Sequence, residues 1–430
     1  YGFLQDSFQV FELRFIGHRE NLLYGLLFAL IFGILAAIHP SRYITAPPLT
    51  DTIKGTAYFR GKGKTLRSIL LCLQFTFVIT LLIASITIEK QLSFWRNFDM
   101  GIDREYVMYM PLSEKMKLHH NSLVHELTKS PLILDYSISQ YIPGAVHMAW
   151  GRQLNNKYIP RIISWPVDDR FIDFFGIKIS EGRAFSPGSE MDKNTFIINQ
   201  KAQEIIGWEN PLGQRIEGFG FMGEVIGVVE NFHFSSLKEE IEPMIFWYTD
   251  TWKDVIMFRL SIENMEQAIG HIKKTARLID PASPAEVKFL QDSLYASYKK
   301  EENMALLVKL ISLWSMLLAF TGLSGMVYFV CLDRKKEIGL RKVNGAKTHE
   351  IMLQLNIGFA RWVGLSFIIA APLGWYLMQQ WLSNFAFRTS LSWWIFAMAG
   401  LTALLLTIIT ASIQTWKTAS SNPIEAIRYE

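Results

Sequence analysis

The segment Gly-Lys-Gly-Lys-Thr at residues 61–65 has the residue types that cradle a nucleotide phosphate. A phosphate-binding loop also needs a strand leading into it and a glycine five positions before Gly63, where this chain has Tyr58. No strand pattern precedes the segment, and a basic linker at a membrane surface explains its lysines better. The sequence therefore predicts no ATP site and no bound cofactor in this chain.

Three histidines, His119, His120 and His125, lie close enough in the sequence to suggest a metal site. Apart from Glu126 beside His125, no cysteine or carboxylate accompanies them at a usual ligand spacing, so we expect a solvated helix face and no metal. The serine, histidine and aspartate residues elsewhere form no nucleophile motif. The chain is therefore predicted not to be an enzyme.

Long apolar runs indicate what kind of protein this is. Half of the 430 residues are hydrophobic and 19% are charged, whereas soluble domains have about 25% charged residues. Runs of about 17 to 25 apolar residues are long enough to cross the hydrocarbon core of a membrane. Five such runs occur, at residues 22–38, 69–88, 304–332, 357–378 and 393–413. Two of them hold the only cysteines, Cys72 and Cys331, which we expect to be small packing residues.

Basic residues in the connections predict the orientation of the spans. The links 39–67 and 333–356 each carry six lysines and arginines, whereas 379–392 has only Arg388, so both basic links are placed in the cytoplasm. The predicted order is an extracytoplasmic tail (1–19), a span (20–38), a basic cytoplasmic link (39–67), a span (68–88), an extracytoplasmic domain (89–303), a span (304–332), a cytoplasmic segment (333–356), a span (357–378), an extracytoplasmic loop (379–392), a span (393–415) and a cytoplasmic tail (416–430).

The region 89–303 has the alternating patterns of a folded domain. Segments 195–199, 223–229 and 244–248 are rich in β-branched and aromatic residues, which predicts strands. Segments 119–129, 201–206 and 262–278 have helical spacing of apolar residues. The predicted fold class is therefore an α-helical membrane protein of five transmembrane helices with an α+β extracytoplasmic domain.

The basic segment 333–356 has more order than a topology signal requires. Its charge would hold it to anionic membrane lipid, at about 1 kcal/mol per basic residue. Helical spacing of two apolar residues, a glycine that can end a helix and a restart at 347–350 predict two helices joined by a break. We expect this elbow to couple to a partner. Its predicted site residues are Glu337, Ile338, Gly339, Leu340, Arg341, Lys342, Val343, Gly345 and Ala346.

Several motifs resemble those of one family. Residues 337–346 (EIGLRKVNGA) are similar to the cytoplasmic signature of MacB/FtsX-like permeases, the membrane subunits of type VII ABC transporters, and 422–430 resemble the usual ending of that family. Segments 171–185, 198–199, 207–213 and 227–246 look like its periplasmic core domain. A faint repeat around Pro48 and Pro423 suggests a duplicated permease. The resemblance then makes 20–38 the last span of a missing first half.

This resemblance implies a function and partners. A cytosolic ABC ATPase subunit would hydrolyse ATP, the elbow would dock on it, and motion would pass through 304–332 to the periplasmic domain. This mechanotransmission would export or expel periplasmic cargo. Other implied partners are the missing half or a second permease copy, a periplasmic adaptor and anionic lipid, with no nucleic acid. The expected place is the inner membrane of a Gram-negative bacterium.

The alternatives left open are other members of the same family and a different class of protein. An FtsX-like activator of cell-wall hydrolases and a lipoprotein-release permease would share the same elbow. A membrane-bound ligand sensor is disfavoured because the inner segments are too short to form an output domain.

Overall fold

The computed structural model describes residues 62–218 and 220–420, together with six residues between positions 23 and 34. The chain divides into two compact units. The helical unit takes in Tyr1–Leu92, Lys300–Leu382 and Ser390–Glu430, and the sheet unit takes in Ser93–Lys299 and Ser383–Thr389.

Long apolar helices make up the helical unit. They are α5 (Lys62–Arg96), α12 (Lys299–Asp333), α14 (Thr348–Leu382) and α15 (Trp393–Ser420), with the short α13 (Lys335–Val343) between α12 and α14. Among the described residues, these four long helices are long and apolar enough to cross a membrane. The predicted span at 20–38 lies mostly outside the described residues, as do the tail 1–19 and the motif 422–430. The count of five spans therefore stays a prediction.

Small and branched side chains form the core of the helical unit. Ile395, Ala399 and Ala403 recur every four residues along α15, so they line one face of that helix, and all three are buried. A Cβ placed on Gly374 of α14 would stand 2.9 Å from the Ile83 side chain, so the glycine permits close packing against α5. Cys72 and Cys331 are both buried in this unit and are not joined in a disulfide, in line with the expectation that they are small packing residues.

The outward faces of the same helices are apolar. Only 22% to 44% of the most apolar window of each long helix is buried within the chain. The rest presents leucine, isoleucine and aromatic side chains, which is unfavourable in water and suited to lipid.

The start of α5 also contains Lys62–Thr65, so these residues lie in a helix and not in a phosphate-binding loop.

The sheet unit contains one mixed sheet of eleven strands. The strands are β1 (Val107–Pro111), β2 (Ile133–Ser139), β3 (Ala149–Leu154), β4 (Lys157–Val167), β5 (Ile179–Gly182), β6 (Thr195–Asn199), β7 (Arg215–Gly218), β8 (Phe221–Val229), β9 (Met244–Tyr248), β10 (Val255–Leu260) and β11 (Lys288–Phe289). The helices are α6 (Glu114–Leu118), α7 (His120–Leu127), α8 (Phe171–Phe174), α9 (Gln200–Ile206), α10 (Met265–Ile279) and α11 (Leu290–Ala296), with a 3-10 turn η1 at Glu190–Asn194.

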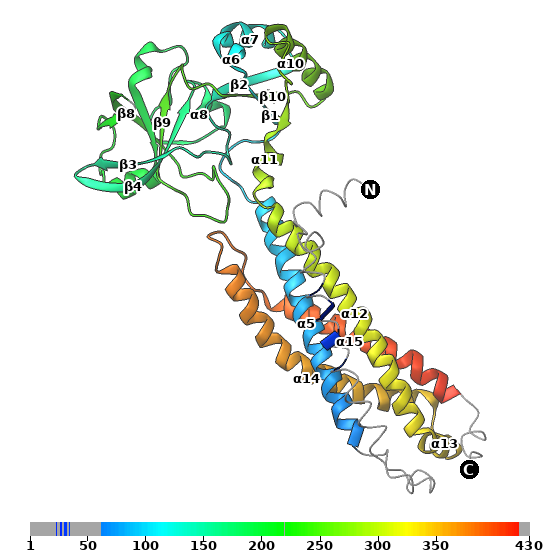
Figure 1. Cartoon of the computed structure of the whole chain (residues 1–430). Coiled ribbons are helices and arrows are strands. Elements are labelled where there is room, and N and C mark those ends of the chain that lie inside the picture. The colour runs from blue at the N-terminus through cyan, green and yellow to red at the C-terminus, as the bar shows by residue number, and fades with distance from the viewer. Residues whose placement is uncertain are drawn as a thin grey trace. The chain divides into compact units, whose positions relative to one another are not determined.

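The strand order is β11-β1-β10-β2-β4-β9-β6-β8-β5, with β3 added on β4 and β7 on β8. The β4/β9 and β6/β8 pairs are parallel and the others are antiparallel. A single residue pair, Ser139 with Val167, joins β2 to β4. In Figure 1, α6, α7 and α10 gather beside β1, β2 and β10, while β3, β4, β8 and β9 lie on the other side of this junction.

Several predicted elements are present at or near their expected positions. Strands β6 and β9 have the predicted bounds, β8 begins two residues earlier, and α7, α9 and α10 overlap the three predicted helices.

Among the described residues, no group of three or more histidine, cysteine, aspartate or glutamate side chains is arranged to hold a metal. His120 instead contacts Lys253 Nζ at 2.9 Å and the Lys117 carbonyl.

Candidate functional site

The predicted elbow consists of α13 and the turn that joins it to α14. The amide of Ala346 donates to the Arg341 carbonyl (2.9 Å) and the amide of Gly345 donates to the Lys342 carbonyl (3.0 Å). This pair of bonds is a Schellman motif, which requires a left-handed residue after the helix, and Gly345 has φ +90°. The predicted break is therefore present and is closed by backbone hydrogen bonds.

The next helix begins with its own cap. The backbone amide of Lys347 donates to a Glu350 carboxylate oxygen at 3.2 Å, and the Glu350 amide donates back to the Lys347 carbonyl at 3.1 Å. This reciprocal arrangement satisfies amides that a helix start otherwise leaves without partners. Because both ends of the turn 344–347 are capped, the angle between α13 and α14 is held by the backbone.

One face of α13 anchors the elbow to the helical unit. Ile338 is buried in the same apolar cluster as Ile351 and Leu355 of α14, and Ala346 packs against this cluster. Gly339 is also buried. The elbow is thus not a free surface loop, and displacement of α13 would move the first turns of α14.

Polar contacts of Arg341 hold the other side of the elbow. Its guanidinium forms an ion pair with Glu337 at 2.7 Å, one helical turn earlier, and donates a hydrogen bond to the side-chain oxygen of Gln354 on α14. Sequence reasoning missed Gln354, because a glutamine in an amphipathic segment carries no signal of its own. Its partner Arg341 was predicted as a site residue, and a hydrogen bond joins Arg341 to Gln354 in the structure.

The outer face of α13 is apolar and basic. Leu340 is 59% exposed and Val343 is 66% exposed, three residues apart on the same helix. Lys342 lies beside them, half-buried. Exposed aliphatic side chains next to a cation are suited to contact another protein and have no catalytic chemistry. The predicted elbow residues therefore have two roles. Ile338 and Ala346 pack against the helical unit, whereas Leu340 and Val343 are exposed on the outer face.

A second feature, missed from the sequence, is the loop between α14 and α15. Residues 383–389 belong to the sheet unit. The amides of Ala386 and Phe387 donate to the carbonyls of Lys238 (3.0 Å) and Leu237 (3.1 Å), and Trp95 Nε1 donates to the Phe387 carbonyl (2.9 Å). The middle of the predicted loop 379–392 is therefore an integral part of a folded domain, whereas its two ends belong to the helical unit.

Aromatic rings complete the attachment of this loop. Phe387 lies edge-on to His233, with ring centres 4.2 Å apart, and Phe385 lies edge-on to Trp95 at 5.0 Å. Trp95 also stacks on Tyr298 at 4.8 Å. Burial lowers the pKa of His233 to about 4, so its ring is neutral at pH 7. The aromatic residues in 379–392 were the sequence signal that could have indicated a packed loop.

A buried carboxyl strengthens the narrow junction of the sheet. Asp168, which follows β4, accepts hydrogen bonds from the Ser137 hydroxyl (2.7 Å) and the Ile138 amide (2.7 Å) of β2. Burial raises the pKa of Asp168 to about 7, although these hydrogen bonds act in the opposite direction. Its position beside the single β2/β4 residue pair indicates a structural role.

This carboxyl predicts a pH dependence of stability. A folded-state pKa above the ordinary value means that folded protein binds the proton more tightly, so the stabilisation is complete below about pH 4 and is lost as the pH rises through 7. Relative to Asp168→Asn, the wild-type melting temperature should fall by about 5 °C between pH 5 and pH 8. Calorimetry of the purified full chain in detergent would measure this, and parallel curves for the two proteins would contradict it.

Comparison with known proteins identifies the part of the chain that contains the elbow. Residues 309–423 match the family described as FtsX-like permease C-terminal. The C-terminal part of the chain is therefore similar to the C-terminal domain of FtsX-like permeases. The matched region includes most of α12, the whole of α13 and α14, and α15.

Curated relatives are ABC transporter permeases. The chain is 23% identical over 288 residues to the uncharacterized ABC transporter permease YknZ of Bacillus subtilis, covering 61% of this chain and 69% of that protein. It is 23% identical over 279 residues to the macrolide export ATP-binding/permease protein MacB of Bdellovibrio bacteriovorus, covering 58% of this chain and 41% of that protein. The chain thus spans about two fifths of the length of this MacB relative.

Two solved structures that align with part of this chain are domains of proteins named MacB and YknZ. The periplasmic region of MacB from Actinobacillus actinomycetemcomitans aligns with a TM-score of 0.35 and 15% identity, covering 45% of this chain and 92% of that one. The extracellular domain of YknZ aligns with a TM-score of 0.32 and 17% identity, covering 42% and 96%. Together with the four long helices, the relatives and the FtsX-like domain indicate a multi-pass protein of a bacterial cell membrane.

Proposed function

We propose that this chain is the permease of an ABC transporter that converts ATP hydrolysis on a cytosolic ATPase subunit into movement of the sheet unit outside the membrane. The observation that carries this proposal is the elbow. Its backbone is capped at both ends, Ile338 anchors it inward, and Leu340 and Val343 face outward. A rigid element with an exposed apolar face suits a partner that pushes on it.

The path of the motion follows the chain. Helix α12 is continuous over 35 residues, about 50 Å. One residue, Arg334, separates its end from the start of α13. Its first residue, Lys299, is the last residue of the segment Ser93–Lys299 of the sheet unit. A continuous helix transmits displacement along its axis, so motion at the elbow reaches residue 299 without a hinge. The loop 383–389, which joins α14 to α15, provides a further route.

The charge distribution supports a cytoplasmic elbow. The connection 333–356 holds six lysines and arginines, whereas the connection 379–392 at the other end of α14 has only Arg388. Basic residues are concentrated on the cytoplasmic side of bacterial membrane proteins. The sheet unit then faces outward, where it would act on a cargo. Macrolide export, the activity in the name of the MacB relatives, is one candidate activity for this permease.

Capture of the ATPase tests this function. The full chain, carrying an affinity tag and expressed in its own host, should retain an ABC ATPase through purification in mild detergent, identified by mass spectrometry. Adding the purified chain should change the ATP hydrolysis rate of that ATPase. A chain that folds in the membrane and captures no ABC ATPase would overturn the proposal.

A further inference from the structure

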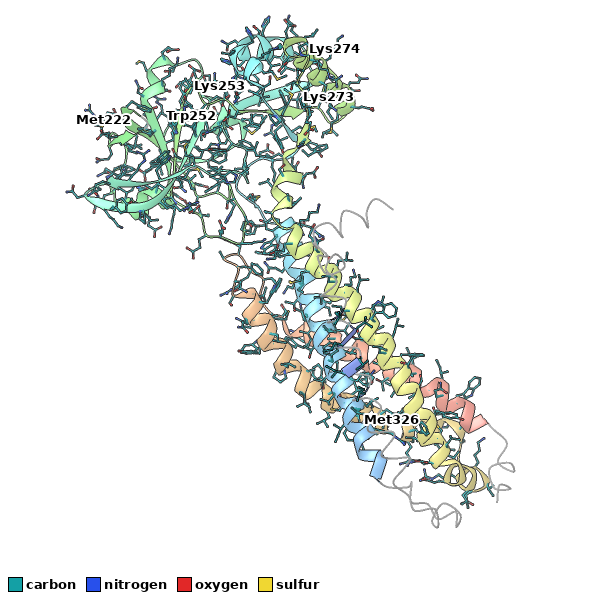
Figure 2. The ribbon with its side chains drawn as sticks, viewed as in Figure 1. Met222, Trp252, Lys253, Lys273, Lys274 and Met326 are labelled. Atoms are coloured by element: carbon teal, nitrogen blue, oxygen red, sulfur yellow. The ribbon has the colours of Figure 1, made fainter. Side chains whose placement is uncertain are left out.

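A cavity of about 400 Å³ opens in the helical unit beside the elbow. Its walls come from three helices: Ser68 lies on α5, Met326 and Val330 on α12, and Gln354 and Phe359 on α14. Met326 is labelled in Figure 2, on the part of α12 that leads to α13. The cavity is open at its mouth and does not form a closed void.

Two arginines give this cavity its charge. Arg334 follows the last residue of α12, and Arg361 lies on α14 about 20 Å along the axis from the helix start at Thr348. No carboxylate lines the cavity, and among the described residues neither guanidinium has an ion pair. An arginine within a membrane helix is costly unless a partner neutralises it. The cavity therefore favours an anion.

The remaining walls are apolar and aromatic. Val330, Leu355, Phe359 and Trp362 line it together with Met326. A small hydrated anion would leave these side chains in water. An anion that carries a hydrocarbon chain would cover them while its charged group meets the arginines. Arginine also suits phosphate in particular, because its planar guanidinium donates two parallel hydrogen bonds.

We propose that this cavity binds the phosphate group of an anionic membrane phospholipid, with Arg334 and Arg361 as the phosphate-binding residues. Ser68 and Gln354 supply the uncharged polar groups of the wall. The shared chemistry is that of a phosphate anion, and the apolar walls favour a lipid as its source.

The site is connected to the elbow through one side chain. Gln354 lines the cavity and accepts the hydrogen bond of Arg341. A bound headgroup would contact the same segment of α14 that holds α13 in place. Lipid binding itself does not depend on the proposed function, but this connection would let the lipid steady the elbow.

A glycine offers a test that leaves the charges intact. No heavy atom lies within 4 Å of where a Cβ on Gly358 would stand, and Gly358 lines the cavity. Gly358→Leu should therefore fill the cavity without disturbing the packed core. Gly364→Leu is the matched control, because that glycine lies on the same helix, has equally open space and is not in the cavity wall.

The experiment measures lipid retention by native mass spectrometry of the purified full chain. Phosphatidylglycerol, phosphatidylcholine and inorganic phosphate are the three probes. The wild-type chain should retain phosphatidylglycerol in preference to phosphatidylcholine. Arg334→Gln and Arg361→Gln should each lower this retention about tenfold, the effect of losing one charge-assisted contact. Gly358→Leu should lower it by a similar factor because its side chain occupies the space of the lipid. Gly364→Leu and Lys309→Gln, a charge removal elsewhere on α12, should leave it unchanged.

Three results would overturn the proposal. Equal retention by the wild type and the three cavity variants would place the lipid elsewhere. Displacement of the lipid by millimolar inorganic phosphate would assign the site to a soluble anion. A wild-type dimer that Gly358→Leu converts to a monomer, with no change in lipid retention, would make the cavity an interface between two copies of the chain.

Discussion

Replacing Leu340 with aspartate should lower the amount of ABC ATPase that co-purifies with the full chain at least tenfold. Leu340 is 59% exposed on α13, so an interface that covers it gains about 1.5 to 3 kcal/mol from burial. The variant loses this gain and would also bury a carboxylate without a partner. Since about 1.4 kcal/mol corresponds to a tenfold change in affinity, the ratio of ATPase to permease after affinity purification should fall clearly.

The control for this variant is Leu118→Asp. Leu118 is the last residue of α6 in the sheet unit and is 79% exposed, so the same substitution is made at an equally accessible leucine far from the elbow in sequence. Capture should be unchanged there. The melting temperature of Leu340→Asp should match the wild type, because Ile338 and not Leu340 anchors α13. Undiminished capture by Leu340→Asp would show that the exposed face of α13 is not the docking surface.

Local sequence rules were sufficient to predict the break between the two helices of the elbow. Gly345 ends α13 because its φ of +90° is strained for other residues, and this requirement is visible from the residue type alone. The contact between Arg341 and Gln354 could not be predicted. It joins residues 13 apart across a turn, and its existence depends on the angle at which the two helices pack.

Strands of the sheet unit were also predicted only where local residue preferences were strong. β6 and β9 were predicted at their observed bounds because they are short, buried and rich in branched or aromatic residues. β4 was missed, and it contains Pro160 and Pro166, which lack the amide donors of a ladder. β4 forms because it pairs with strands that are distant in the sequence, as in its parallel pairing with β9.

The loop 383–389 was predicted only as a connection between two spans. Its place in the sheet unit depends on partners at Trp95, His233 and Leu237, which lie about 150 to 290 positions away in the chain. No local pattern encodes such pairing. The cavity beside the elbow was equally hidden, because Arg334 and Arg361 belong to different helices. The sequence did predict anionic lipid as a partner, but from surface charge and not from a site.

Replacing Phe387 with alanine should leave ATPase capture intact and weaken transmission to the sheet unit. The variant loses the ring contacts with His233 and Phe98, while the elbow is untouched. Loss of a half-buried aromatic contact costs about 1 to 2 kcal/mol. The amides of Ala386 and Phe387, which donate to the sheet unit, should then exchange with solvent about tenfold faster in hydrogen-exchange mass spectrometry.

The functional consequence is measured on the complex with its ATPase. In the wild type, addition of ATP should change hydrogen exchange within residues 93–299, and in Phe387→Ala this ATP-dependent change should fall to less than half. Arg388→Ala is the control, because the neighbouring side chain is exposed in the same loop. A full ATP response in Phe387→Ala, despite faster exchange of the loop, would mean that α5 and α12 alone carry the motion. A combined loss of capture and response would instead mean that the loop stabilises the whole permease, since α14 joins it directly to the elbow.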